Sequence, residues 1–212
     1  MALILLSKGS YDVKKLWSKF EKWLELNCQE IVDSFNEPAA KAEITKAEQK
    51  MGVTFPDSLK GLLLIHNGQR NEYPEQRFEY VGAIGNYELL TIEEIVDTWE
   101  TMKELLDNKL FEDFDEVEAV GPVKEEYWWN PRWISIATNG TGDDICIDLD
   151  PDEGGTVGQV ITFWYDWEEW KVISRSLEEW FGEITKCLED GTYKLIEEDG
   201  ELVFNNDGFM GE

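Results

Sequence analysis

The spacing of apolar residues changes partway along this 212-residue chain, and that change most constrains its fold. Up to about residue 106, apolar residues recur every three or four positions, as on one face of a helix. From residue 133 onward they gather in short β-branched or aromatic runs between Gly, Asn and Asp turns, as in strands. Helices followed by a group of strands predict a single-domain α+β fold with a mainly antiparallel sheet packed against helices.

Capping and stop residues mark the helices of the first half. Gly52 follows the second helix, Asp57 can cap the third, and Asn67-Gly68 ends it. The run Thr91–Glu94 has the pattern of a capping box. The predicted helices span about Tyr11–Cys28, Lys41–Met51, Asp57–His66 and Ile92–Leu106.

The second half predicts a strand meander, one helix and a closing hairpin. A short strand near Tyr87–Leu90 precedes it, and residues 107–126 are predicted to form an acidic connector of loop or irregular helix. The meander strands are Trp133–Ala137, Ile145–Leu149, Val160–Phe163 and Trp170–Ile173. A second capping box at Ser176–Glu179 begins a helix that stops at Gly191. Two short strands, Tyr193–Ile196 and Leu202–Phe204, are predicted to pair through a turn at Asp199-Gly200.

The chain is strongly acidic, with 46 Asp and Glu against 19 Lys and Arg, a net charge of −27. Residues 107–212 hold 28 acids and 7 bases, whereas residues 1–106 hold 18 and 12. Nucleic acid and anionic membranes are poor partners for such a chain. A basic protein partner is favoured, because complementary potentials speed encounter. The alternative is that the acidity serves solubility alone.

Cysteine and histidine give little support for metal, disulfide or nucleophile chemistry. Cys28, Cys146 and Cys187 are widely spaced without a Cys-x-x-Cys pair, which favours free thiols in a reducing compartment. His66 beside Asn67-Gly68 is expected to be a packing or capping residue. The opening MALILLSKGS is too short for a signal-peptide core, and nothing resembles a membrane span. We therefore expect a cytoplasmic protein.

The stretch WWNPRWISIATNGTGDDICIDLDPDEGGTVGQV places six carboxylates within eleven positions. They are Asp143, Asp144, Asp148, Asp150, Asp152 and Glu153. Counted from Asp148, a calcium loop would need Gly where Glu153 stands and Glu where Gln159 stands. Phosphate-binding glycine motifs are absent as well. Neither a specific metal site nor a cofactor is therefore predicted, and a weak, non-specific cation contact of this stretch is left open.

The remaining readings of this stretch are structural, partner-binding and catalytic. Asp148 is expected either to point away from the core or to accept backbone hydrogen bonds at a turn, and a structural role is favoured. Four other acids are predicted to lie in turns and face a partner, namely Asp143, Asp144, Asp152 and Glu153. Trp128 and Trp129 are candidate interface anchors, with one expected to point inward and one outward. A carbohydrate-acting enzyme would use an acid pair beside aromatics, but with 46 acids such pairs arise by chance.

Three segments in order resemble the SUKH superfamily, in its Smi/Knr-type branch of fungal glucan-synthesis and killer-toxin-resistance regulators. They are AAKAEITKAEQKMGVTFPDSLKGLLLIHNGQ, WNPRWISIATNGTGDDICIDLDPDEGGTVGQVI and SRSLEEWFGEITKCLEDG. The matching residues of the first are Ile44, Glu48, Gly52, Pro56, Asn67 and Gly68, and those of the second are Trp133, Ile136, Gly142, Asp148, Pro151, Gly158, Gln159 and Val160. Ala39-Ala40 departs from the family's usual Gly or Ser. The resemblance covers about residues 11–195, so the hairpin of 193–212 is an extension.

The resemblance implies an α+β fold without established catalytic residues and a role in protein binding. Bacterial members are typically immunity proteins that neutralise toxins, often nucleases, whereas fungal members act as scaffolds in cell-wall regulation. Combined with the acidity, this favours a non-enzymatic immunity protein that binds and occludes a basic, nuclease-type toxin. The alternatives are a regulatory scaffold of the glucan-synthesis type and a carbohydrate-acting enzyme. The oligomeric state is left open.

Overall fold

The computed structural model describes residues 12–70, 82–111, 118–125, 128–164, 169–198 and 201–204. Its central sheet has six strands, which are β1 (Glu88–Leu89), β2 (Glu118–Val120), β3 (Trp133–Thr138), β4 (Asp144–Asp148), β5 (Gln159–Trp164) and β6 (Glu169–Ser174). Their order across the sheet is β1-β3-β4-β5-β6-β2. Every neighbouring pair is antiparallel except β2 and β6, which run parallel. The predicted α+β fold is confirmed.

The helices are α1 (Val13–Asn27), α2 (Gln29–Ser34), α3 (Lys41–Met51), α4 (Asp57–Leu63), α5 (Ile92–Asp107) and α6 (Leu177–Asp190). The capping box that begins α5 is confirmed, because the Thr91 hydroxyl accepts from the Glu94 N–H and the Glu94 carboxylate accepts from the Thr91 N–H. The Ser176 hydroxyl caps α6 in the same way by accepting from the Glu179 N–H. The closing hairpin is also confirmed as β7 (Leu195–Glu198) and β8 (Glu201–Phe204), although its turn at 199–200 lies outside the described residues.

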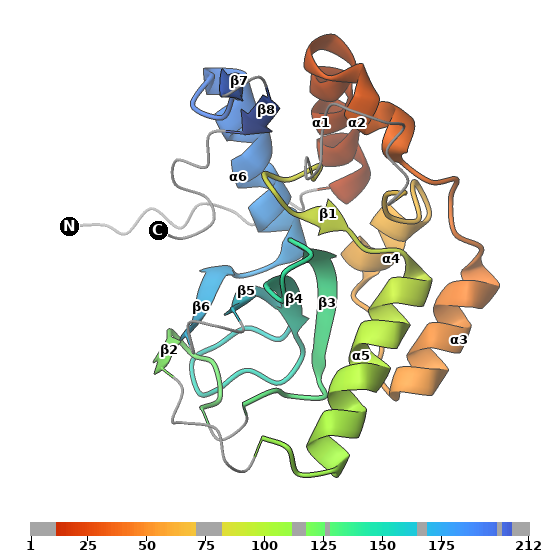
Figure 1. Cartoon of the computed structure of the whole chain (residues 1–212), viewed down its shortest axis with the longest axis vertical. Helices are drawn as coiled ribbons and strands as arrows, with labels where there is room; N and C mark the ends of the chain where they lie inside the picture. The colour runs from red at the N-terminus through yellow and green to blue at the C-terminus, as the bar shows by residue number, and fades with distance from the viewer. Residues whose placement is uncertain are drawn as a thin grey trace, which may run out of the picture.

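The main core lies between one face of the sheet and the helices above and beside it (Figure 1). Helix α1 packs against α4 and α6, and the rings of Phe20 and Phe181 meet edge to face with centroids 5.9 Å apart. His66 stacks on Phe35 at the end of the loop after α4, which confirms its packing role. Inward residues of β3, β4 and β5 complete this core, namely Ile134, Ile136, Ile145, Ile147 and Val160.

A second core covers the opposite face of the same sheet. Strand residues Trp133, Cys146, Phe163 and Trp170 form it, together with residues from the segment between α5 and β3. We call the described residues of this segment (108–111, 118–125 and 128–132) the covering segment. In Figure 1, β2 lies at the edge of the sheet opposite β1, and α5 lies beside β3. All five residues of β4 are buried as a result.

One short helix was missed, and two local predictions were wrong. Residues 29–34 form the short helix α2, whose six residues carry too few apolar repeats to reveal it. The predicted connector at 107–126 contains β2, which pairs with β6. Helix α4 ends at Leu63 rather than near Asn67-Gly68, and its N-cap is Pro56 instead of Asp57. Among the described residues, no helix is long and apolar enough to cross a membrane.

Asn67 and Gly68 join the start of α5 to the loop after α4 instead of ending a helix. The Asn67 Oδ1 accepts from the Ile92 N–H at 2.9 Å. Gly68 has φ +68°, and a Cβ at this position would lie 2.5 Å from backbone atoms of Leu90 and Thr91. Only glycine fits here, because the position requires both a left-handed conformation and a close backbone approach.

We predict that Gly68→Ala destabilises the protein by about 4 kcal/mol or more. The added Cβ would displace the backbone of Leu90 and Thr91, and alanine would also be strained at a φ of +68°. Gly52→Ala is the matched control, since Gly52 has the same φ of +68° but no atom within 4 Å of an added Cβ. Its cost should be about 1–2 kcal/mol, the cost of the left-handed conformation. Urea unfolding of both variants measures the difference, and equal losses would contradict the close approach.

Candidate functional site

Strand β4 divides the six clustered carboxylates between its two ends. Asp143 and Asp144 lie where β4 begins, whereas Asp150, Asp152 and Glu153 follow its last residue, Asp148. Four residues of extended strand separate the two groups by about 13 Å. The acids therefore do not form one patch, although they are close in sequence.

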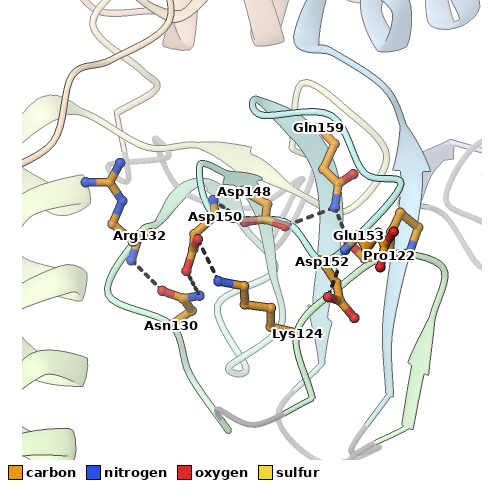
Figure 2. Close-up of polar contacts among 9 residues, drawn as sticks. All are labelled: Pro122, Lys124, Asn130, Arg132, Asp148, Asp150, Asp152, Glu153 and Gln159. Carbon is orange, nitrogen blue, oxygen red and sulfur yellow. Dashed lines mark hydrogen bonds and ion pairs between the residues drawn. The ribbon is translucent and has the colours of Figure 1, made fainter.

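Asp148 is fully buried and organises the loop between β4 and β5, which we call the acidic loop (residues 149–158). Its Oδ1 accepts from the Asp150 N–H at 2.8 Å, and its Oδ2 accepts from the Gln159 Nε2 at 2.9 Å (Figure 2). Burial raises the pKa of Asp148, while these two hydrogen bonds act in the opposite direction. The predicted structural role at a turn is confirmed.

Gln159 connects this carboxylate to the covering segment. Its Nε2 also donates to the Pro122 carbonyl at 3.0 Å, and the Asp152 N–H donates to the same oxygen at 3.1 Å. On its other side, the Gln159 Oε1 accepts from the Thr156 N–H at 3.1 Å. One buried amide thus holds the acidic loop, β4 and residue 122 together (Figure 2).

Asp150 makes the second connection between the acidic loop and the covering segment. Its Oδ1 lies 2.8 Å from the Lys124 Nζ, and its Oδ2 accepts from the Asn130 Nδ2 at 3.2 Å. Asn130 is itself 1% exposed, and its Oδ1 accepts from the Arg132 N–H. The hydrogen bond from Lys124 lowers the pKa of Asp150. Asp150 is therefore a charged structural group that faces its own chain.

Asp152 and Glu153 lie at the exposed tip of the acidic loop. The Asp152 Oδ1 accepts from the neighbouring Glu153 N–H, and both side chains face solvent. Val157, on the same loop, is 69% exposed. Of the predicted partner-facing acids, these two have the surface position that the prediction requires, and their role in binding stays a prediction.

Asp144 does not lie in a turn, as the sequence suggested, but is the first residue of β4 and only 7% exposed. Burial raises its pKa from 3.8 to about 6, although hydrogen bonds from Ser135 and Thr138 lower it. Little of this side chain can reach a partner. Asp143 is half-buried in the turn before β4, where its Oδ2 accepts from the Asn139 Nδ2 at 2.8 Å.

The two candidate tryptophan anchors both lie against the second core. Trp129 is 2% exposed, which confirms the inward member of the pair. Trp128 does not project outward, because its half-buried ring stacks on Phe111 at 4.7 Å and meets Phe163 edge to face at 5.4 Å. Packing against the second core accounts for the position of both tryptophan side chains. An interface role for either remains a prediction.

The arrangement offers little for metal or acid–base chemistry. No group of three or more His, Cys, Asp or Glu within the described ranges is placed to hold a metal ion. A glycosidase needs an acid with a raised pKa in a cleft. Burial raises the pKa of three carboxyls among the described residues, Asp144, Asp148 and Glu183, but none of them lines the apolar cavity beneath α4 or the groove between α3 and α5.

The sequence did not reveal the residues that bind the acidic loop through hydrogen bonds and an ion pair. Pro122, Lys124 and Asn130 belong to or follow the acidic connector, whose composition suggested a loop without a fixed partner. A usable signal was present, because Val123 is an apolar residue within a charged run and is 2% exposed. Its apolar neighbours Ala119 and Val120 are adjacent in the sequence and give no clear period, however, so Val123 could not be assigned to a face.

The structure is thus an α+β domain whose sheet is covered on both faces. Its acidic loop is held by hydrogen bonds to other parts of the same chain. A model of the SMI1 / KNR4 family (SUKH-1) matches residues 38–183, so the chain belongs to that family. It is 24% identical to the cell wall assembly regulator SMI1 of Saccharomyces cerevisiae over 93% of this chain and 46% of the relative. It is 26% identical to a glucan synthesis regulatory protein of Neurospora crassa over 90% of this chain and 41% of the relative.

A third relative is the cell wall biosynthesis/cell cycle regulator smi1 of Schizosaccharomyces pombe, 25% identical over 90% of this chain and 39% of its own length. The chain therefore spans less than half the length of each of these relatives. All three are named as regulators. The family resemblance drawn from the sequence is confirmed.

We predict that Asp144→Asn stabilises the protein above pH 6 and has little effect at pH 4. A folded-state pKa of about 6, raised from 3.8, means that charging Asp144 costs the folded state up to about 3 kcal/mol. This penalty is absent below the unfolded pKa, grows between pH 4 and 6, and is complete above pH 6. Unfolding free energies of both proteins at pH 4 and pH 8 test it, and an equal difference at both values would contradict it.

We also predict that Asp148→Ala costs roughly 2–4 kcal/mol, because two buried donors lose a charged acceptor. Glu153→Ala is the control within the same acidic stretch and should change stability by less than about 0.5 kcal/mol. Denaturant titrations of the two variants provide the comparison. Similar stabilities would show that Asp148 does not hold the acidic loop.

Proposed function

We propose that this chain is a non-enzymatic protein-binding module that regulates cell-wall assembly or a similar process. The observation that carries the proposal is that Asp148 and Asp150, the central acids of the motif, are engaged in hydrogen bonds with their own chain. Carboxylates that are hydrogen-bonded to their own chain in this way stabilise the shape of a surface and are not available for acid–base catalysis. The relatives' names, as regulators of cell-wall assembly and glucan synthesis, support the same class.

The partner of such a module is a protein with a basic surface. A net charge of −27 produces a negative potential that attracts basic surfaces and repels nucleic acid and anionic lipid. Exposed acids that lack a structural task, such as Asp152 and Glu153, are suited to this contact. The free thiols Cys28, Cys146 and Cys187 are compatible with the cytoplasm as its location.

Neutralisation of a basic toxin is the second candidate function. It is favoured by the uneven charge, since residues 107–212 carry 28 acids against 7 bases. An acidic surface of this kind can cover the basic active site of a nuclease and exclude its substrate. In that case the chain acts as an immunity protein, and its partner is encoded in the same cells.

We predict that the purified chain, used as bait in extracts of cells that produce it, captures basic proteins. Each captured protein, once purified, should bind this chain at least about tenfold more weakly at 300 mM salt than at 50 mM salt, because salt screens exposed charges. Calorimetry measures both affinities. Partners whose affinity does not change with salt would contradict a charge-driven interface.

Co-expression of the chain with each captured protein separates the two candidates. Survival of cells that the partner alone kills indicates toxin neutralisation. Partners that are harmless alone, and whose loss alters cell-wall synthesis, indicate the regulatory role. If no purified protein binds, the proposal of a binding module is wrong.

A further inference from the structure

A groove runs between α3 and α5, which lie side by side in the same direction on the flank of the molecule (Figure 1). Its volume is about 380 Å³, and its floor includes the apolar side chains of Ala47, Ile92 and Val96. The Lys50–Glu100 ion pair, 2.6 Å long, joins the two helices. A volume of this size holds a small ligand or one or two side chains, because drug-sized pockets begin near 300 Å³.

The α5 side of the groove presents two carboxylates that have no partner in the part of the chain that the structure describes. Glu93 and Asp97 are exposed and four residues apart, so they lie on the same face of the helix. Neither forms a hydrogen bond through its side chain or an ion pair with another residue in the described ranges. Like charges at this spacing repel each other, and a cation placed between them relieves that repulsion.

The α3 side carries a weaker and mixed charge. Lys46 is exposed and is not paired within the described part of the chain, whereas the Glu43 carboxylate accepts from the Ala40 N–H at 2.6 Å. The lining carboxylates that have no partner within the described ranges therefore lie along α5, beside the apolar floor. A complementary ligand has an aliphatic part and a cationic end.

We infer that this groove binds an arginine side chain, with an adjacent apolar residue, from a basic segment of the partner protein. The arginine stem covers Ile92 and Val96, and its guanidinium meets Glu93 and Asp97. Arginine suits the site better than lysine, because its planar fork is less strongly hydrated and pairs with carboxylates through two hydrogen bonds. The inference rests on the proposed function and adds the position and chemistry of the contact.

The probe is the peptide acetyl-Ala-Leu-Arg-Leu-Ala-amide, titrated into the full chain and followed by backbone amide chemical shifts. The same peptide with citrulline in place of arginine keeps the shape and removes the charge. We expect the arginine peptide to shift amides within residues 46–50 and 92–97 and the citrulline peptide to bind at least about tenfold more weakly, a loss of about 1.4 kcal/mol.

Three variants locate the contact. Asp97→Lys should weaken binding of the arginine peptide about tenfold, whereas Lys46→Glu should strengthen it, because local charge decides both changes. Glu104→Lys is the matched control, with the same change of charge on the same helix but outside the groove, and should change affinity by less than about twofold. Circular dichroism of each variant confirms that it is folded.

Several results of the peptide titrations would overturn the inference. They are equal binding of the citrulline peptide, shifts confined to other acidic regions such as the acidic loop, and equal effects of Asp97→Lys and Glu104→Lys. An absence of shifts up to on the order of 10 mM peptide would do so as well, since that limit corresponds to negligible affinity. Purified partners that still bind the Asp97→Lys variant would leave the proposed function standing and show only that the groove is not their site.

Discussion

The structure depends on covering a sheet whose two faces are both apolar. The main core occupies one face, but Trp133, Cys146, Phe163 and Trp170 point from the other. The covering segment solves this problem, although its composition is acidic and it contributes only the three-residue strand β2. It is fastened by the buried Asp148–Gln159 pair, whose amide reaches the Pro122 carbonyl. An ionisable group in a motif that resembles a ligand site is therefore part of the fold.

The acidic stretch contains two kinds of carboxylate, those bound by their own chain and those exposed at the surface. Asp148 and Asp150 are engaged by their own chain, whereas Asp152 and Glu153 remain at the surface. This distinction limits the fully exposed acids of the stretch to Asp152 and Glu153. It also directs attention to other surfaces, such as the groove between α3 and α5, where Glu93 and Asp97 adjoin an apolar floor.

Residue patterns predicted the elements that have a clear period or a capping signal. Helix α3 was predicted with its observed bounds, and Thr91 and Ser176 begin α5 and α6 as expected. The covering segment could not be predicted, because its position depends on contacts with the sheet rather than on its own periodicity. The burial of Asp144 was missed for a related reason. A carboxylate beside a turn is usually exposed, and only the pairing of β4 with strands on both sides encloses it.

The acidic loop is held in place by its own chain and needs no ligand for its structure. Amide hydrogen exchange of the free protein tests this directly at Asp150, Asp152 and Gly158, whose N–H groups donate to the Asp148 carboxylate, the Pro122 carbonyl and the Asp148 carbonyl. We predict slow exchange at all three, comparable to amides of β5. Exchange at the rate of an unstructured chain would contradict this account of the acidic loop. The loop would then again be a candidate ligand-binding site.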